Sequence, residues 1–119
     1  MYDHIGLKVS DLDASVRFYS AALAPLGHVL CSRDATGAGF GPQGEPALWL
    51  YLHPGQKGDG AHLAFRAPDH AAIKSFHREG LKAGGKDNGK PGPRADYSPS
   101  YYAAFLIDPD GNNVEAVCA

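Results

Sequence analysis

Two short segments of the chain alternate apolar and polar residues in the manner of strands with one buried face. In residues 5–9 every second side chain is apolar, and residues 62–67 repeat this alternation. A period of two places successive side chains on opposite faces of a strand. The apolar side chains are predicted to face a core, so the other face carries His4 beside the first segment and His62 in the second.

A helical pattern follows each predicted strand. Apolar side chains recur at helical spacing over residues 12–23, and Ser10 with Asp13 fits a capping box at the start of this helix. The second helix is predicted to begin at Asp69 and to end at the glycine pair 84–85. Each helix is expected to cover the apolar face of its sheet. The two histidine-bearing faces then stay open, and two such sheets could form a cup.

The two halves of the chain are related by an internal repeat. When His4 is aligned with His62, no gap is needed through the helix that follows, and Lys8 with Arg66 forms a conservative pair. The further identical pairs are Asp11/Asp69, Ala14/Ala72, Phe18/Phe76, Leu23/Leu81 and Gly27/Gly85. Strand-like runs follow both helices, over residues 29–32, 39–40, 47–53, 101–107 and 114–117. The pattern predicts a strand, a helix and about three strands, twice.

The predicted fold class is therefore α+β, with two βαβββ modules whose curved mixed sheets share one domain. That domain spans residues 1–119, and its modules cover about 1–56 and 57–119.

Three side chains in this arrangement could carry chemistry. His4 and His62 are equivalent in the repeat, and Glu115 lies in a short apolar strand near the C-terminus. Two imidazoles and one carboxylate on inward faces would form a ligand set for a divalent metal, with open positions for water or substrate. Each residue also has an ordinary interpretation. The histidines could be surface residues, and Glu115 could be an edge-strand charge that discourages aggregation.

Residues 84–100 are rich in glycine and proline and contain almost no apolar side chain. One interpretation is a lid or rim over the cup, and the other is a solvated connection. As a rim, Lys86, Lys90 and Arg94 could meet an anionic substrate, and a nearby tyrosine could donate a hydrogen bond to a metal-bound oxygen. Arg94 and Tyr101 are the preferred candidates.

Two other motifs are predicted to be structural. The sequence Asp108-Pro109-Asp110-Gly111 favours a tight turn that closes a hairpin and sets the register that directs Glu115 inward. Trp49 and Tyr51 could line the cup or fill the core, and for Trp49 the core is the favoured place.

Composition and charge exclude several classes of protein. The chain has 119 residues, a net charge of −2 and a pI near 6.3, which argues against binding to nucleic acid or to an anionic membrane surface. The longest apolar run, residues 47–52, is too short to span a bilayer. Cys31 and Cys118 form no paired-cysteine motif and no signal segment is recognised, so we expect a cytoplasmic protein with free thiols.

Nearly the whole chain resembles the vicinal oxygen chelate superfamily, which includes glyoxalase I, fosfomycin resistance proteins, extradiol dioxygenases and bleomycin resistance proteins. The most specific segments are residues 3–9, 11–19, 60–65 and 105–115. The resemblance implies paired βαβββ modules around one divalent ion (Zn, Mn, Ni or Fe). The family's ligand positions match His4, His62 and Glu115.

The resemblance implies a metal-dependent enzyme whose small substrate chelates the ion through oxygen. The lyase, isomerase, thiol-transferase and dioxygenase reactions all stay open, and Glu115, Tyr101 and Arg94 are the catalytic candidates. Glyoxalase I usually has a fourth ligand, a carboxylate on the last strand of its first module. Residues 47–52 contain no acid and Glu45 precedes them, so a three-ligand site as in the fosfomycin resistance and extradiol branches is favoured. The alternative is a non-catalytic drug-binding protein of the bleomycin resistance type.

The resemblance also implies a homodimer. In many small relatives the complete cup is built from two chains, so His4 of one chain is expected to join His62 and Glu115 of the other. The expected partners are a small molecule, anionic if the basic rim binds it, and a second copy of the chain. Neither nucleic acid nor membrane is expected to bind.

Overall fold

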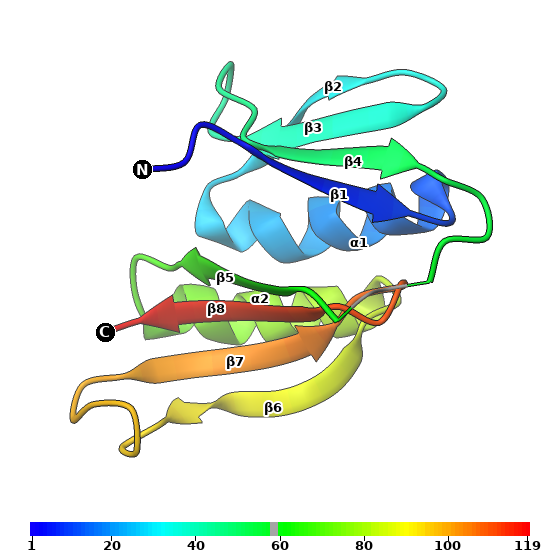
Figure 1. The fold of residues 1–119 in the computed structure, drawn as a ribbon. Helices are drawn as coiled ribbons and strands as arrows, with labels where there is room; N and C mark the ends of the chain where they lie inside the picture. Colours follow the sequence, from blue (N-terminus) through cyan, green and yellow to red (C-terminus); the bar gives the residue numbers. More distant parts are fainter. Residues whose placement is uncertain (58–59) are drawn as a thin grey trace.

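The computed structural model describes residues 1–57 and 60–119. Within them the chain forms two α-helices, one short 3-10 helix and eight strands (Figure 1). The first half contains β1 (Ile5–Val9), α1 (Leu12–Leu23), η1 (Ala24–Leu26), β2 (Val29–Arg33), β3 (Gly37–Gly41) and β4 (Leu48–Leu52). The second half contains β5 (His62–Arg66), α2 (His70–Lys82), β6 (Lys86–Pro93), β7 (Tyr102–Ile107) and β8 (Asn113–Cys118).

Each half forms a four-stranded mixed sheet. The strand orders are β1-β4-β3-β2 and β5-β8-β7-β6, so the two sheets have the same topology. In each, the first strand pairs in parallel with the last strand, and the other neighbours are antiparallel. The predicted α+β fold of two βαβββ units is confirmed.

The helices occupy the space between the two sheets' apolar faces. Figure 1 shows α1 against one face of the first sheet and α2 against one face of the second, and the two helices pack against each other. The predicted apolar stripes are largely buried, including Val9 of β1, Tyr19 of α1 and Phe76 of α2. Leu81, which was also predicted to face the core, is exposed near the end of α2. The opposite face of each sheet has no helix over it. The histidine-bearing faces are therefore open, as the alternation predicted.

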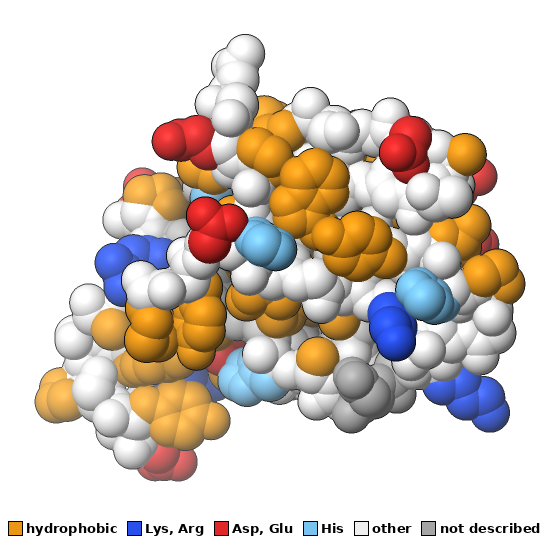
Figure 2. All heavy atoms as spheres, turned by 45° about the horizontal axis from the view of Figure 1, so that its top comes forward, with side chains coloured by type: hydrophobic (Ala, Val, Ile, Leu, Met, Phe, Trp, Pro, Cys, Tyr) orange, Lys and Arg blue, Asp and Glu red, His pale blue; other side chains and the backbone are white. Residues whose placement is uncertain are grey.

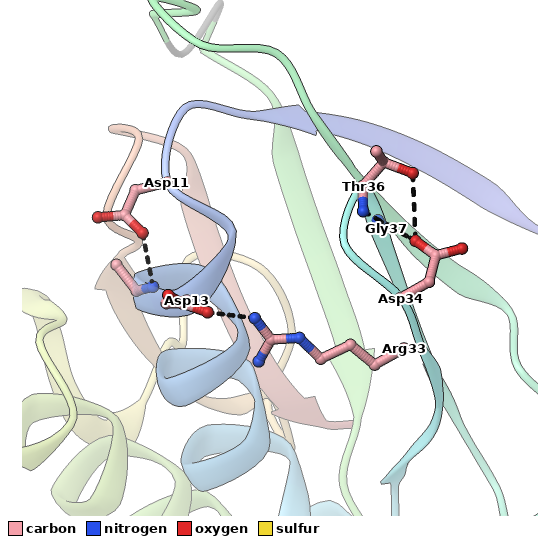
Figure 3. Close-up of polar contacts among 7 residues, drawn as sticks. Asp11, Asp13, Arg33, Asp34, Thr36 and Gly37 are labelled. Atoms are coloured by element: carbon pink, nitrogen blue, oxygen red, sulfur yellow. Dashed lines mark hydrogen bonds and ion pairs between the residues drawn. The ribbon is translucent and has the colours of Figure 1, made fainter.

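The start of α1 differs from the predicted capping box. Asp11, not Ser10, is the N-cap residue, and its Oδ1 accepts a hydrogen bond of 3.0 Å from the backbone N–H of Ala14. Asp13 instead forms an ion pair with Arg33 of β2 (Figure 3). Ser10 does not cap the helix because its hydroxyl donates a hydrogen bond to Asp110, which is distant in the sequence. At α2 the predicted start is confirmed, because Asp69 caps the helix.

A carboxylate also closes the β2–β3 hairpin. Asp34 Oδ1 accepts hydrogen bonds of 2.8 and 2.9 Å from the backbone N–H groups of Thr36 and Gly37, as Figure 3 shows. These bonds lower the pKa of Asp34. The turn holds β3 beside β2 with its backbone donors satisfied.

The segment expected to be a loop, residues 84–100, contains strand β6. This strand lies at the edge of the second sheet, where proline and glycine are tolerated because one row of backbone groups needs no partner. Its pairing with β7 is interrupted between Asp87 and Gly89 and again between Gly89 and Gly92. Gly89 has a φ of 156°. Composition alone predicted a loop here because the strand has no apolar alternation.

The predicted turn after β7 is confirmed, and it makes contacts that the sequence did not predict. Asp108 Oδ2 accepts a 2.6 Å hydrogen bond from the hydroxyl of Tyr19 on α1, and both side chains are buried. Asp110 Oδ1 accepts bonds from the backbone N–H and the hydroxyl of Ser10, at 3.0 and 2.7 Å. The second unit is thus bonded to the first through the turn that leads into β8.

The same turn also fixes the start of β5. Asn112 donates from Nδ2 to Asp108 Oδ2 at 3.0 Å and accepts through Oδ1 from the backbone N–H of Ala61 at 3.2 Å. Ala61 immediately precedes His62, so the turn holds β5 beside β8 at the level of the candidate ligands. In the described residues, no helix has the length and apolar character needed to cross a membrane.

Candidate functional site

The second sheet brings two of the three predicted ligands together. His62 begins β5 and Glu115 lies in the neighbouring parallel strand β8, with His62 Nε2 2.8 Å from Glu115 Oε1. The Glu115 side chain is 3% exposed, whereas that of His62 is 52% exposed. A buried carboxylate is stable only with partners, and here one oxygen faces an imidazole that is open to solvent.

Tyr101 supplies the partner of the other Glu115 oxygen. Its hydroxyl donates a hydrogen bond of 2.5 Å to Oε2. This bond, with some burial and the negative charge of Glu115, raises the pKa of Tyr101 to about 12. Tyr101 therefore keeps its proton near neutral pH and acts as a hydrogen-bond donor in this site. The structure places this hydroxyl against Glu115, whereas the sequence analysis expected it to donate to a metal-bound oxygen.

Aromatic rings surround this cluster. Phe105 of β7 lies opposite Glu115 in the strand register, with its ring centroid 6.4 Å from that of His62. Tyr97 packs edge-on against Tyr101, with 5.0 Å between the ring centroids. His62 and Tyr101, the two partners of Glu115, thus lie among aromatic rings, which reduce the access of water to Glu115.

Arg94, the other predicted candidate, is near the cluster but is engaged by its own loop. Its guanidinium donates to the backbone carbonyls of Lys90, Gly92 and Pro93, at 2.7, 2.9 and 3.3 Å. It also lies 5.4 Å from the ring centroid of Phe105, within cation–π range. These contacts order the turn that leads to Tyr101.

His4 immediately precedes β1 of the other sheet, apart from His62 and Glu115. Its side chain is 55% exposed, and its Nδ1 is 2.7 Å from Asp3 Oδ1. A carboxylate on one ring nitrogen fixes the tautomer and leaves Nε2 free to bind a metal. In the described part of the chain, no three His, Cys, Asp or Glu side chains gather into a metal-binding group. The sequence analysis missed Asp3, although an acid adjacent to a candidate histidine is a detectable signal.

The open face of the first sheet is aromatic. Trp49 and Tyr51 of β4 point to this face, away from α1, so the expectation that Trp49 fills the core is wrong. A Cβ on Gly39 would lie 2.8 Å from the Trp49 ring, and one on Gly6 would lie 2.9 Å from Tyr51. The rings therefore lie over glycines. Figure 2 shows hydrophobic side chains gathered across the middle of this face, with histidines beside them.

The residues of the second sheet fit a divalent ion. An imidazole nitrogen and a carboxylate oxygen suit Zn, Mn, Ni and Fe, and the separation of 2.8 Å between them is close to that of neighbouring ligands on one ion. The hydrogen bond from Tyr101 to the second oxygen of Glu115 is the kind that orients a metal ligand. One chain thus holds an oriented pair of candidate ligands.

Comparison with known families identifies the fold and the family. The profile of the Glyoxalase/Bleomycin resistance protein/Dioxygenase superfamily matches residues 2–116. The chain belongs to this superfamily. It includes enzymes such as glyoxalase I, and its members bind small molecules, commonly with a divalent metal.

Solved structures of the superfamily share the whole fold. A glyoxalase/bleomycin resistance protein from Albidiferax ferrireducens T118 is 29% identical, with a TM-score of 0.82 over 98% of this chain and 97% of that one. Glyoxalase I from Zea mays is 28% identical, with a TM-score of 0.74 over 98% of this chain and 43% of the maize chain. A family enzyme from Burkholderia phytofirmans PsJN, 17% identical, shares the fold with a TM-score of 0.74 over 97% and 95% of the two chains. A comparison with curated proteins finds no match.

Proposed function

We propose that this protein is a metal-dependent enzyme of the superfamily, acting on a small substrate that chelates the ion through oxygen. The observation that carries the proposal is the cluster of His62, Glu115 and Tyr101, in which a buried carboxylate is held between an exposed imidazole and a protonated phenol. A carboxylate with a purely structural role would not need a solvent-open imidazole as its partner.

The third ligand comes from a second chain. His4 is oriented by Asp3, but among the described residues of its own chain it belongs to no group of three metal-binding side chains. The sheet faces near His4 and His62 are both open. A homodimer that places the first sheet of one chain over the second sheet of the other would unite His4 with His62 and Glu115 of the partner subunit. Two equivalent sites would form. The apolar rings of Trp49 and Tyr51 would be covered in the same step.

The residues of the chain then have distinct roles. His62 and Glu115 hold the ion, which when bound polarises substrate oxygens and stabilises negative charge on them. Tyr101 orients Glu115, and Arg94 orders the loop that places Tyr101. With no acid in β4, the site has three protein ligands. This number suits an isomerase, thiol transferase, dioxygenase or lyase that keeps open positions for the substrate.

A second candidate, a binding protein without turnover, is favoured by one observation. The open face of the first sheet presents Trp49 and Tyr51, which form a surface on which a planar drug could stack. This candidate predicts that ligand binding needs neither a metal nor His62.

The metal content of the purified protein tests the proposal. About one ion per chain is expected after purification without chelators, and His4→Ala or Glu115→Ala should each remove it while the circular dichroism spectrum is unchanged. His53→Ala is the matched control, because His53 is exposed at the end of β4 and belongs to neither ligand group. Wild-type protein without a bound ion, or variants that retain it, would refute the ligand assignment.

Mixing the two ligand variants tests the shared site. A heterodimer of His4→Ala and Glu115→Ala chains contains one intact site and one site without either residue. We therefore expect an equal mixture, after dissociation and reassociation, to recover about a quarter of the wild-type ion content. If all ligands came from one chain, the mixture would stay empty.

A further inference from the structure

Two arginines near the candidate site, Arg66 and Arg94, differ in their contacts. Arg94 uses its guanidinium on three backbone carbonyls of its own turn, as described above. Arg66, at the end of β5, makes no side-chain hydrogen bond and no ion pair with any described residue, the chain-end carboxylate included. Among the described residues, Arg66 is therefore a cation without a side-chain partner.

Arg66 lies on the same face of the second sheet as the ligand pair. Along β5, His62 and Arg66 point to one side, because they are separated by an even number of residues. In the parallel pairing, Arg66 lies beside Val117, while Ala64 lies beside Glu115. One two-residue step along a strand is about 7 Å. The base of the Arg66 side chain is therefore about one such step beyond Glu115.

A pocket lies beside Arg66 and reaches Tyr101. Its volume is about 470 Å³, and it is lined by Arg66, Ala67, Pro68, Tyr101, Val117, Cys118 and Ala119. Tyr101 is the side chain that donates to Glu115, so it forms the boundary between this cavity and the ligand pair. Glu115 forms no ion pair with Arg66 in the described structure, and its two oxygens face His62 and Tyr101 instead.

We propose that Arg66 binds the terminal oxyanion of the substrate in this cavity. This inference rests on the proposed function and adds the substrate class: a small acid, carboxylate or phosphonate, whose chelating oxygens lie at the His62–Glu115 end. Its anionic group lies about 7 Å further along the strand, where the guanidinium fork matches two oxygens of such a group. The sequence analysis expected Arg94 to bind the anion. We assign this role to Arg66 instead, because Arg94 is bonded to backbone carbonyls and Arg66 has no side-chain partner among the described residues.

Anion binding to metal-free protein tests this assignment. The full chain is treated with chelator and titrated with inorganic phosphate and, separately, with propionate at constant ionic strength. Binding is followed through the backbone amide NMR shifts of Val117 and Cys118. We expect Arg66→Gln to weaken binding of at least one probe by about tenfold, the usual effect of losing a charge-assisted hydrogen bond. Phosphate and propionate distinguish a phosphonate-like from a carboxylate-like substrate.

Two controls make the result decisive. Lys74→Gln removes an equal charge from the exposed surface of α2 and should leave both affinities unchanged. Equal weakening by Arg66→Gln and Lys74→Gln would indicate a general charge effect and overturn the proposal. Weakening by Arg94→Gln alone, or shifts at neither amide, would overturn it as well. Because the titration contains no metal, its outcome is independent of the ion-content experiment that tests the proposed function.

Discussion

At the scale of single residues, two carboxylates, those of Glu115 and Asp87, are each positioned by specific hydrogen-bond partners. Glu115 is held between His62 and Tyr101, and Asp87 of β6 accepts a 2.8 Å hydrogen bond from Nε2 of His77 on α2. The first contact forms the candidate site. The second attaches the edge strand to its helix, and the hydrogen bond from His77 lowers the pKa of Asp87.

The Asp87 contact predicts a pH-dependent contribution to stability. A carboxyl group whose pKa is lowered by folding stabilises the native state above its ordinary pKa of 3.8, and this contribution is lost as the pH falls through the lower native value. Asp87→Asn should therefore lower the urea midpoint at pH 6, with a difference from wild type that shrinks progressively as the pH falls below 3.8. Asp96→Asn, an exposed acid in the following turn, is the control. A difference that is constant over this pH range would contradict the prediction.

At the scale of secondary-structure elements, glycines in the strands make room for aromatic rings on the open face. Gly39 of β3 lies under Trp49 of β4, its partner in the antiparallel register. The apolar run that forms β4 was detectable in the sequence. The placement of Trp49 was not, because either face of a strand can accept an aromatic ring until the position of the helix is known.

Gly39→Ala tests this packing. The added Cβ would lie 2.8 Å from the Trp49 ring, so the ring must move. We expect a loss of about 1 kcal/mol in the free energy of unfolding. The fluorescence of Trp49, the single tryptophan of the chain, should also change. Gly92→Ala, in β6, has more space around its Cβ and should leave the emission unchanged. Equal spectra for wild type and Gly39→Ala would show that the ring does not lie over Gly39.

At the scale of the whole molecule, the two units are connected through the turn between β7 and β8. Tyr19 of α1 reaches Asp108, and Ser10 reaches Asp110, across the boundary between the halves. Burial and the neighbouring Asp108 raise the pKa of Tyr19 well above its usual value. The same turn, through Asn112, holds the start of β5 beside β8. The relative position of the units and the local geometry of His62 thus depend on one turn.

Tyr19→Phe should weaken this connection without leaving a cavity. The lost hydrogen bond is to a buried carboxylate, so we expect the free energy of unfolding to fall by about 1.5–3 kcal/mol in urea titrations. Tyr102→Phe is the matched control, because Tyr102 stacks on His70 and makes no side-chain hydrogen bond in the described structure. If both variants lost the same stability, the bond from Tyr19 to Asp108 would not connect the units.

The sequence by itself determined the order of the elements, the repeat and the faces of the strands. These follow from local geometry, since a period of two or 3.6 residues reveals which side chains share a face. That is why Val9, Tyr19 and Phe76 were correctly assigned to the core, and His4 and His62 to the open faces. Strand β6 was missed because an edge strand rich in glycine and proline has no such period.

Only the tertiary structure decided which of these side chains meet. His62 and Tyr101 converge on Glu115 because β5 and β8 are neighbours, and His4 stays apart because α1 and α2 pack together and leave the two sheet faces open. The sequence likewise could not show that the guanidinium of Arg94 is bonded to backbone carbonyls while that of Arg66 has no side-chain partner among the described residues. Contacts between distant residues depend on how whole layers pack, which no local pattern encodes.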